Sequence, residues 1–99
     1  MVVTMNDDRL DLYVLYVILK ILYEKSMKSS VSLMDLFNSF RELTGVKISY
    51  EKFRKHIDYA FKTGLIEAKG EKPKVLVLTK KGIDFIFLFE RIKELVGIK

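Results

Sequence analysis

Hydrophobic and polar positions along the 99 residues predict four helices and two short β-like runs. The first helix is expected over residues 8–27, with Asp7 or Asp8 as its N-cap. Its side chains at helical spacing toward a core are Leu10, Tyr13, Val14, Val17, Ile18, Ile21 and Leu22. Further apolar residues, at positions 12, 15, 16 and 19, fill its other sides. A helix that is apolar all round must be buried on more than one face.

The second helix is expected over about residues 33–44. Ser32 and Asp35 resemble a capping box, and Gly45 supplies the left-handed residue that ends the helix. Its inward face is expected to carry Leu36, Phe37, Phe40 and Leu43. Residues 46–48 then predict a single-rung strand.

A third helix is expected over residues 50–63, capped by Ser49 and ended by Gly64. Its inward side chains are predicted to be Phe53, Ile57, Ala60 and Phe61. The single histidine, His56, is expected to be half-buried in a structural role.

The β-like runs at residues 65–68 and 75–79 flank KGEKPK, in which Gly70 and Pro73 favour a turn, so a hairpin is predicted. Thr79 then caps a last helix over about residues 80–96. That helix, like the first, is apolar on more than one side.

Residues 32–82 resemble a winged helix-turn-helix domain, with residues 33–63 as the helix pair and 65–79 as the wing. FKTGLIE is similar to the end of a recognition helix that runs into a first wing strand, and VLVLTKKG to the closing motif of the wing. The chain length predicts one domain over residues 1–99. The resemblance implies a winged-helix fold for it, mainly α with a small β-hairpin (α+β), in the order α-α-β-α-β-β-α. Length, richness in Lys, Ile and Tyr, and absence of Cys are similar to small archaeal and archaeal-virus transcription regulators.

Positive charge is concentrated in one part of the chain. Residues 47–81 hold ten Lys or Arg against four acidic residues, a net charge of +6, although the whole chain carries only +5. Such clustering is the electrostatic pattern expected for a partner that carries phosphates. The alternative interpretation is a lysine-rich surface that keeps the protein in solution.

The resemblance implies that the helix at 50–63 enters the major groove of double-stranded DNA and that wing lysines contact the backbone. Arg54 and Lys55 are the best candidates for guanine. The predicted contacts are Tyr50, Lys52, Arg54, Lys55 and Tyr59 on the helix, and Lys69, Lys72 and Lys74 on the wing. Alternatively, pairs such as Glu51–Lys55 and Asp58–Lys62 make a solvated helix face, and the wing lysines protect a hairpin edge.

The two apolar terminal helices predict a homodimer, which would present two recognition helices to a pseudo-palindromic site. The residues assigned to this interface are Leu12, Tyr16, Leu19, Phe85, Phe87, Phe89 and Ile92.

Other classes of function find little support in the sequence. One histidine without cysteines provides no metal site, and no catalytic or cofactor-binding motif occurs, so neither enzyme activity nor a cofactor is expected. The apolar run at residues 12–19 is too short to span a membrane, and a cytoplasmic protein is expected, in the host cytoplasm if it is viral. Two alternatives to a transcription regulator stay open: a winged-helix module for protein interaction, and a non-specific architectural protein that binds nucleic acid.

Overall fold

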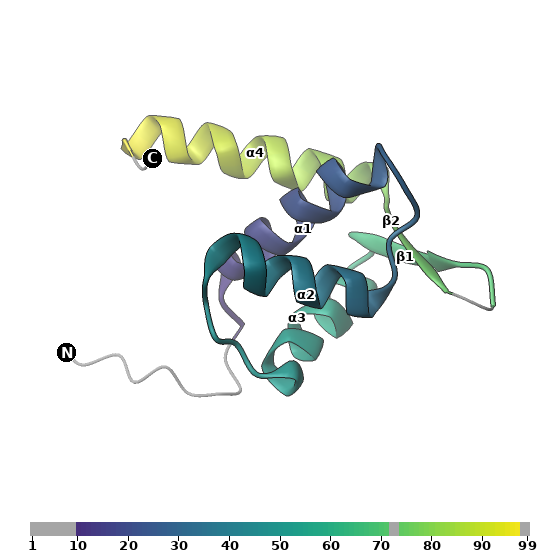
Figure 1. Cartoon of the computed structure of the whole chain (residues 1–99). Helices are drawn as coiled ribbons and strands as arrows, with labels where there is room; N and C mark the ends of the chain where they lie inside the picture. The colour runs from purple at the N-terminus through teal and green to yellow at the C-terminus, as the bar shows by residue number, and fades with distance from the viewer. Residues whose placement is uncertain (1–9, 72–73, 98–99) are drawn as a thin grey trace.

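The part of the chain that the structure describes forms four helices and one two-stranded sheet (Figure 1). The computed structural model describes residues 10–71 and 74–97. The elements are α1 (Leu12–Ser26), α2 (Leu33–Thr44), α3 (Tyr50–Lys62), β1 (Ile66–Lys69), β2 (Val75–Leu78) and α4 (Lys80–Val96). The chain is therefore mainly α with a small β-hairpin, as the sequence predicted.

Side-chain caps define the starts of the last three helices. Ser32 accepts a hydrogen bond from the Asp35 N–H, and the Asp35 carboxylate accepts one from the Ser32 N–H, which completes the predicted capping box of α2. Ser49 accepts from the Lys52 N–H at α3, and Thr79 from the Gly82 N–H at α4. These caps are local in sequence, and all three predictions are confirmed.

The start of α1 differs from the sequence prediction. Its N-cap is Asp11, whose carboxylate accepts hydrogen bonds from the Tyr13 and Val14 N–H groups. Asp7 and Asp8, the predicted caps, lie outside the described residues. Asp11 lies directly before the apolar run, so its carboxylate reaches the first free N–H groups of the helix.

The buried face of α1 also differs from the prediction. Tyr13 is exposed, and Val14 and Val17 are only half-buried. The buried residues are Leu15, Tyr16, Ile18, Leu19, Ile21 and Leu22. Because successive residues of an α-helix are about 100° apart, these three adjacent pairs occupy more than one face.

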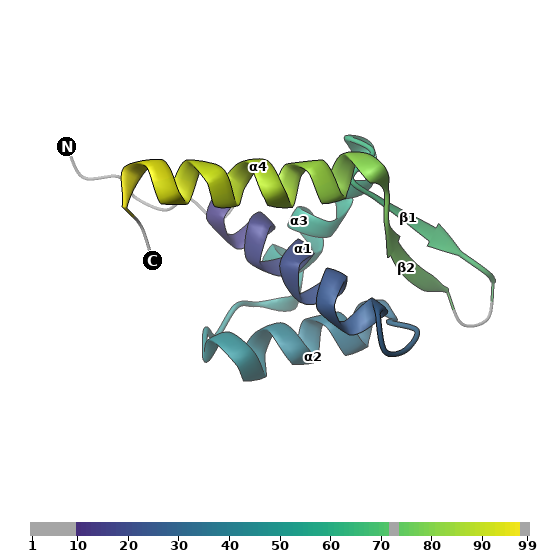
Figure 2. The same cartoon turned by 90° about the horizontal axis from the view of Figure 1, so that it is seen from above.

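Burial on several sides follows from the central position of α1. Figures 1 and 2 show α1 between α4 on one side and α2 and α3 on the other, and α1 also packs against β2. Tyr16 and Leu19 are therefore part of the core of the chain itself. Their assignment to a dimer interface is wrong, because neither side chain is left exposed.

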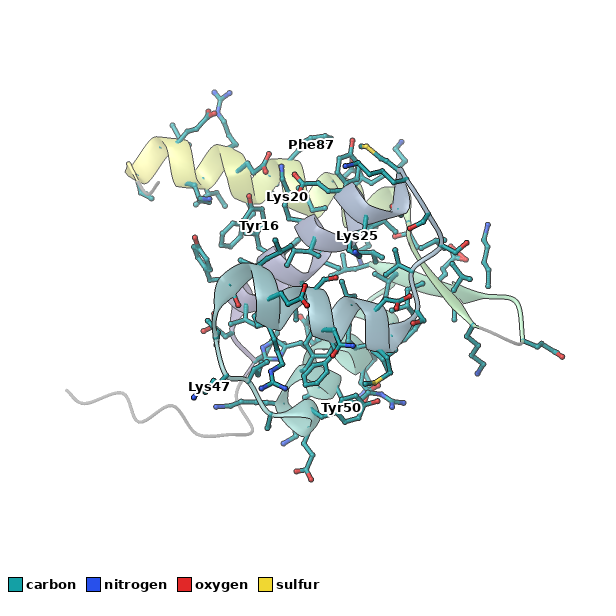
Figure 3. All side chains as sticks on the ribbon, viewed as in Figure 1. Tyr16, Lys20, Lys25, Lys47, Tyr50 and Phe87 are labelled. Atoms are coloured by element: carbon teal, nitrogen blue, oxygen red, sulfur yellow. The ribbon has the colours of Figure 1, made fainter. Side chains whose placement is uncertain are left out.

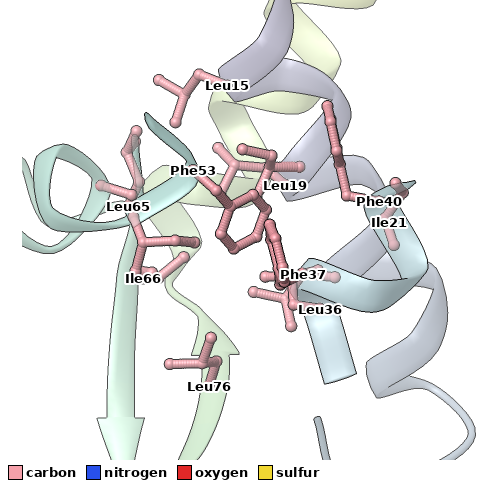
Figure 4. Close-up of a cluster of buried hydrophobic side chains, with 14 of the residues drawn as sticks. Leu15, Leu19, Ile21, Leu36, Phe37, Phe40, Phe53, Leu65, Ile66 and Leu76 are labelled. Carbon is pink, nitrogen blue, oxygen red and sulfur yellow. The ribbon is translucent and has the colours of Figure 1, made fainter. Parts of the chain in front are cut away.

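Aromatic and aliphatic side chains from every element meet in that core (Figure 4). The Phe37 and Phe53 rings, from α2 and α3, lie 5.1 Å apart in an edge-on arrangement, and Phe40 lies 5.9 Å from Phe53. Ile66 and Leu76 close the core from the hairpin. The back of α3 is thus fixed against α1 and α2.

Besides Tyr13, two more predicted core residues are exposed: Leu43 of α2, at 69%, and Phe61 of α3, at 38%. Both lie in the last turn of their helices, where periodicity alone extends the apolar stripe beyond the residues that pack on the core. His56, by contrast, is only 2% exposed and more deeply buried than predicted.

The predicted strand at residues 46–48 is absent: these residues lie in the loop between α2 and α3, in which Ile48 is buried. The hairpin itself is antiparallel, with Ile66 opposite Leu78 and Lys69 opposite Val75. The loop between α1 and α2 is hydrogen-bonded to the edge of the hairpin, because the Val31 carbonyl accepts a hydrogen bond of 2.8 Å from the Leu76 N–H. The order is therefore α-α-α-β-β-α.

A polar cluster fixes α4 against α1. The Glu90 carboxylate accepts a 2.8 Å hydrogen bond from the Tyr16 hydroxyl and pairs with Lys20, and the Phe89 ring stacks on Tyr16 at 4.7 Å. Hydrogen bonds from Lys20 and Tyr16 lower the pKa of Glu90. Burial and the Glu90 hydrogen bond raise the pKa of Tyr16 to about 12.

These shifts predict how stability depends on pH. The lowered pKa of Glu90 means that its ionised form stabilises the fold at higher pH, and this contribution is lost as the pH falls below about 4.5. Tyr16 acts at the other limit, because its stabilising neutral form is lost as the pH rises from 10 through about 12. Glu90→Gln should therefore flatten the acid limb of a plot of melting temperature against pH. Glu94→Gln, an exposed site on the same helix, should retain it, and an unaltered acid limb in Glu90→Gln would contradict the assignment.

Gly82 marks a close approach of backbones at the start of α4. A Cβ atom at this position would lie 2.1 Å from the Leu65 carbonyl oxygen. Gly82→Ala should therefore lower the free energy of unfolding by about 1–3 kcal/mol, although alanine is the better helix former. Thermal unfolding measures the change. Lys80→Ala, exposed in the same turn, should shift stability by less than about 0.5 kcal/mol, and an equal or higher stability of Gly82→Ala would refute the steric account.

Candidate nucleic-acid interface

The side of α3 opposite the core is polar, and its cationic residues outnumber its acidic ones. Phe53, Ile57 and Ala60 fix the buried side of the helix. The exposed residues are Tyr50, Glu51, Arg54, Lys55, Asp58, Tyr59, Phe61 and Lys62, and Lys52 is half-buried. Each α3 residue assigned to DNA therefore lies on the predicted outer side, and Lys52 is the most covered of them.

Arg54 is held by two neighbours on the same face. Its Nε donates to the Asp58 carboxylate at 3.1 Å, and a terminal nitrogen donates to the Tyr50 hydroxyl at 3.4 Å. The hydrogen bonds to Tyr50 and to Asp58, together with the charge of Asp58, raise the pKa of the Arg54 guanidinium. The sequence had suggested other i,i+4 pairs and did not predict this one.

The two tyrosines lie near opposite ends of the exposed face. The Tyr50 ring meets Phe37 of α2 edge-on at 5.3 Å, which fixes its direction. Tyr59 lines a hollow of about 300 Å³ with Leu10, Lys55, Asp58 and Lys62. Leu10 and Lys62 had not been assigned to the site. The spacing of Lys62 from Lys55 and Asp58, at seven and four residues, could have placed it on the same face.

The hairpin projects from the side of the helical body (Figures 1 and 2). Lys69 and Lys74 are exposed near its outer end, and Gly70 turns the chain there with φ = 79°. Lys72, the third lysine assigned to the wing, lies outside the described residues. Two of the three wing lysines are therefore accessible to a ligand.

A cationic contribution that the site assignment missed comes from the segment before α3. Lys47 is exposed two residues before the Ser49 cap, and it lies at the same end of the molecule as Tyr50 (Figure 3). With Arg41 it lines a shallow hollow of about 440 Å³ at the end of α2. The Arg41 guanidinium lies 5.5 Å from the centre of the Phe37 ring. In the sequence, the position of Lys47 close to the predicted Ser49 cap could have indicated that it lies beside the start of α3.

Neither a metal site nor a membrane span is found in residues 10–71 and 74–97. No group of three or more His, Cys, Asp or Glu side chains there is arranged to hold a metal ion. No helix among these residues is long and apolar enough to cross a bilayer.

The outer side of α4 is the main exposed apolar surface. It carries Leu88, Ile92, Leu95 and Val96, all exposed. Phe87, also exposed, meets Tyr23 of α1 edge-on with ring centres 6.3 Å apart, and Leu12 of α1 is exposed as well. Of the residues predicted at a dimer interface, Leu12, Phe87 and Ile92 are thus accessible. Phe85 and Phe89 are partly buried against the core of the chain.

Comparison with solved structures supports the fold. The chain is similar to the crystal structure of SSV1 F-93, with 21% identity and a TM-score of 0.60 over 83% of this chain and 91% of that one. It is also similar to AF1382 from Archaeoglobus fulgidus, with 19% identity and a TM-score of 0.57 over 90% and 89% of the two chains. No protein-family model and no curated protein matches the sequence. At these identities the likeness shows a shared fold.

Proposed function

We propose that the protein is a homodimeric transcription regulator that binds double-stranded DNA at specific sequences. The observation that carries the proposal is the exposed face of α3, where Arg54, Lys55 and Lys62 accompany two tyrosines. The opposite face of the helix is fixed in the core, so these side chains are presented on a rigid element. The projecting hairpin adds Lys69 and Lys74.

In this proposal α3 lies in the major groove and Arg54 reads a base. An exposed ion pair such as Arg54–Asp58, with side chains 50% and 61% exposed, contributes little to stability. Arg54 can therefore exchange Asp58 for the O6 and N7 acceptors of a guanine. Asp58 holds the guanidinium extended along the helix until then, and its negative charge disfavours non-specific approach to phosphates.

The lysines have a different role. Those of the hairpin, and Lys47 before α3, would contact phosphates on either side of the groove that α3 occupies. Phosphate contacts set register and contribute affinity, but they carry no sequence information directly.

The exposed side of α4 provides the surface for a second copy. Leu88, Ile92 and Leu95 follow one another at intervals of four and three residues, the spacing of a packed helix seam. In Figure 1, α4 lies on the side of α1 opposite α3. Pairing through α4 would therefore leave both α3 faces open to DNA.

A competition titration on a selected duplex and a random duplex tests the role of α3. If the replaced residue contacts a base, Arg54→Ala or Lys55→Ala should lower the binding free energy by about 1–3 kcal/mol on the selected site. The loss on random DNA should be smaller. Lys69→Ala should weaken binding to both duplexes equally and reduce the salt slope by about 1. Lys28→Ala, exposed in the loop after α1, is the control and should change neither affinity.

The same titration separates the alternatives. Equal losses on both duplexes in every α3 variant would indicate a protein that only coats nucleic acid. Absence of salt-dependent duplex binding in the wild type would indicate a protein-interaction module. Either result would contradict the proposal.

Sedimentation of the wild-type chain and two glutamate variants tests the dimer. Wild type should sediment at twice the monomer mass at micromolar concentration, and Ile92→Glu should sediment as a folded monomer, because a buried unpaired carboxylate disfavours the interface. Leu43→Glu, at an exposed leucine of α2, should stay dimeric. A monomeric wild type at high micromolar concentration would contradict the dimer.

A further inference from the structure

His56 connects the recognition helix to the start of α1. It lies in the middle of α3 and is the only buried polar or charged residue among residues 10–71 and 74–97. Its Nδ1 lies 2.8 Å from the Lys52 carbonyl oxygen, one turn earlier in α3. Its Nε2 accepts a hydrogen bond of 3.1 Å from the Asp11 N–H, 45 residues away in the sequence.

The partners of the ring fix the role of each nitrogen. A carbonyl oxygen can only accept, so Nδ1 carries the proton and donates it to Lys52. Nε2 is then left with a lone pair that faces the backbone N–H of Asp11. Both ring nitrogens are satisfied in a buried position, and the ring has one orientation.

The Asp11 N–H is the group that a capping box would satisfy. In a capping box the third residue of the helix returns a side-chain acceptor to the N-cap N–H. That residue in α1 is Val14, which has no acceptor. His56 supplies it from another helix instead, so one hydrogen bond both completes the cap of α1 and fixes the position of α3.

Directional contacts therefore occur on two sides of α1. His56 joins α3 to the first residue before α1, and Glu90 joins α4 to Tyr16 and Lys20, two α1 residues labelled in Figure 3. Apolar packing between α1 and α3 is non-directional and tolerates sliding, whereas a hydrogen bond constrains both distance and angle. The position of α3 relative to α4 depends on both connections.

We propose that His56 is a positioning residue that fixes α3 relative to α1, and so sets the half-site spacing that the dimer selects. This inference rests on the proposed function, because spacing has a meaning only for two recognition helices in one complex. His56 itself touches no base. It acts through the position of the face that carries Arg54.

Three variants separate positioning from stability. His56→Leu fills the site without an acceptor, whereas the side-chain amide of His56→Gln can still accept from Asp11 and donate to Lys52. Ile57→Val, at a buried neighbour on the same helix, weakens packing and leaves the hydrogen bond intact. If His56→Leu does not fold, His56→Met replaces it.

The first measurement is binding to duplexes that carry two selected half-sites at the preferred spacing or one base pair further apart. In His56→Leu the preference for the correct spacing should fall about fivefold, the effect of one lost hydrogen bond. His56→Gln should restore most of it, and Ile57→Val should retain it at an equal folded fraction. An unchanged preference in His56→Leu, or an equal loss in Ile57→Val, would overturn the proposal.

The second measurement needs no DNA. The chain has no cysteine, so spin labels can be attached at Glu24→Cys on α1 and Glu51→Cys on α3, both exposed. The distance distribution between them should broaden or shift in His56→Leu and stay narrow in His56→Gln and Ile57→Val. If the wild type shows no spacing preference, the proposed function fails, and an unchanged distance distribution in His56→Leu separately shows that His56 does not position α3.

Discussion

The structure depends on the burial of α1 on more than one face. A helix with apolar residues on all sides needs neighbours around most of its circumference, and α2, α3, α4 and β2 together provide them. This requirement determines what each neighbour exposes. The inner side of α3 is occupied by Phe53 and Ile57, so its charged side faces solvent. The neighbour on the opposite side, α4, buries Ile86 and leaves Leu88, Ile92 and Leu95 exposed.

Polar contacts add direction to this apolar core. The Tyr16–Glu90–Lys20 cluster fixes the register of α4 on α1, and the His56–Asp11 hydrogen bond fixes α3 at the start of the same helix. The proposed DNA-binding face of α3 and the proposed dimer surface of α4 are thereby both held rigidly on α1. In the proposed function, the two α3 faces of a dimer fit a duplex only if α1 keeps α3 and α4 at a fixed angle. The stability of the core is therefore linked to the proposed function.

Local signals in the sequence predicted much of the fold. Ser32, Ser49 and Thr79 each cap a helix within four residues, and such contacts can be predicted without tertiary information. Contacts between residues far apart in the sequence explain the predictions that were wrong. Periodicity could not choose the buried face of α1, where every side is apolar, and it extended the core to Leu43 and Phe61. The candidate site followed the same division. The outer face of α3 was predictable from spacing, and the Arg54–Asp58 pair, at i,i+4 on that face, could have been, whereas the edge contact at Val31 and the His56–Asp11 bond depend on packing.

The central claim is that two copies of one rigid unit place two α3 helices on a single face of a duplex. Hydroxyl-radical footprinting of the wild-type protein on its selected site tests this most directly. The account predicts two protected segments on the same face, about one helical turn or ~34 Å apart, flanked by weaker protection from the hairpin lysines. Uniform protection along the duplex, or one protected segment that does not depend on sequence, would contradict it.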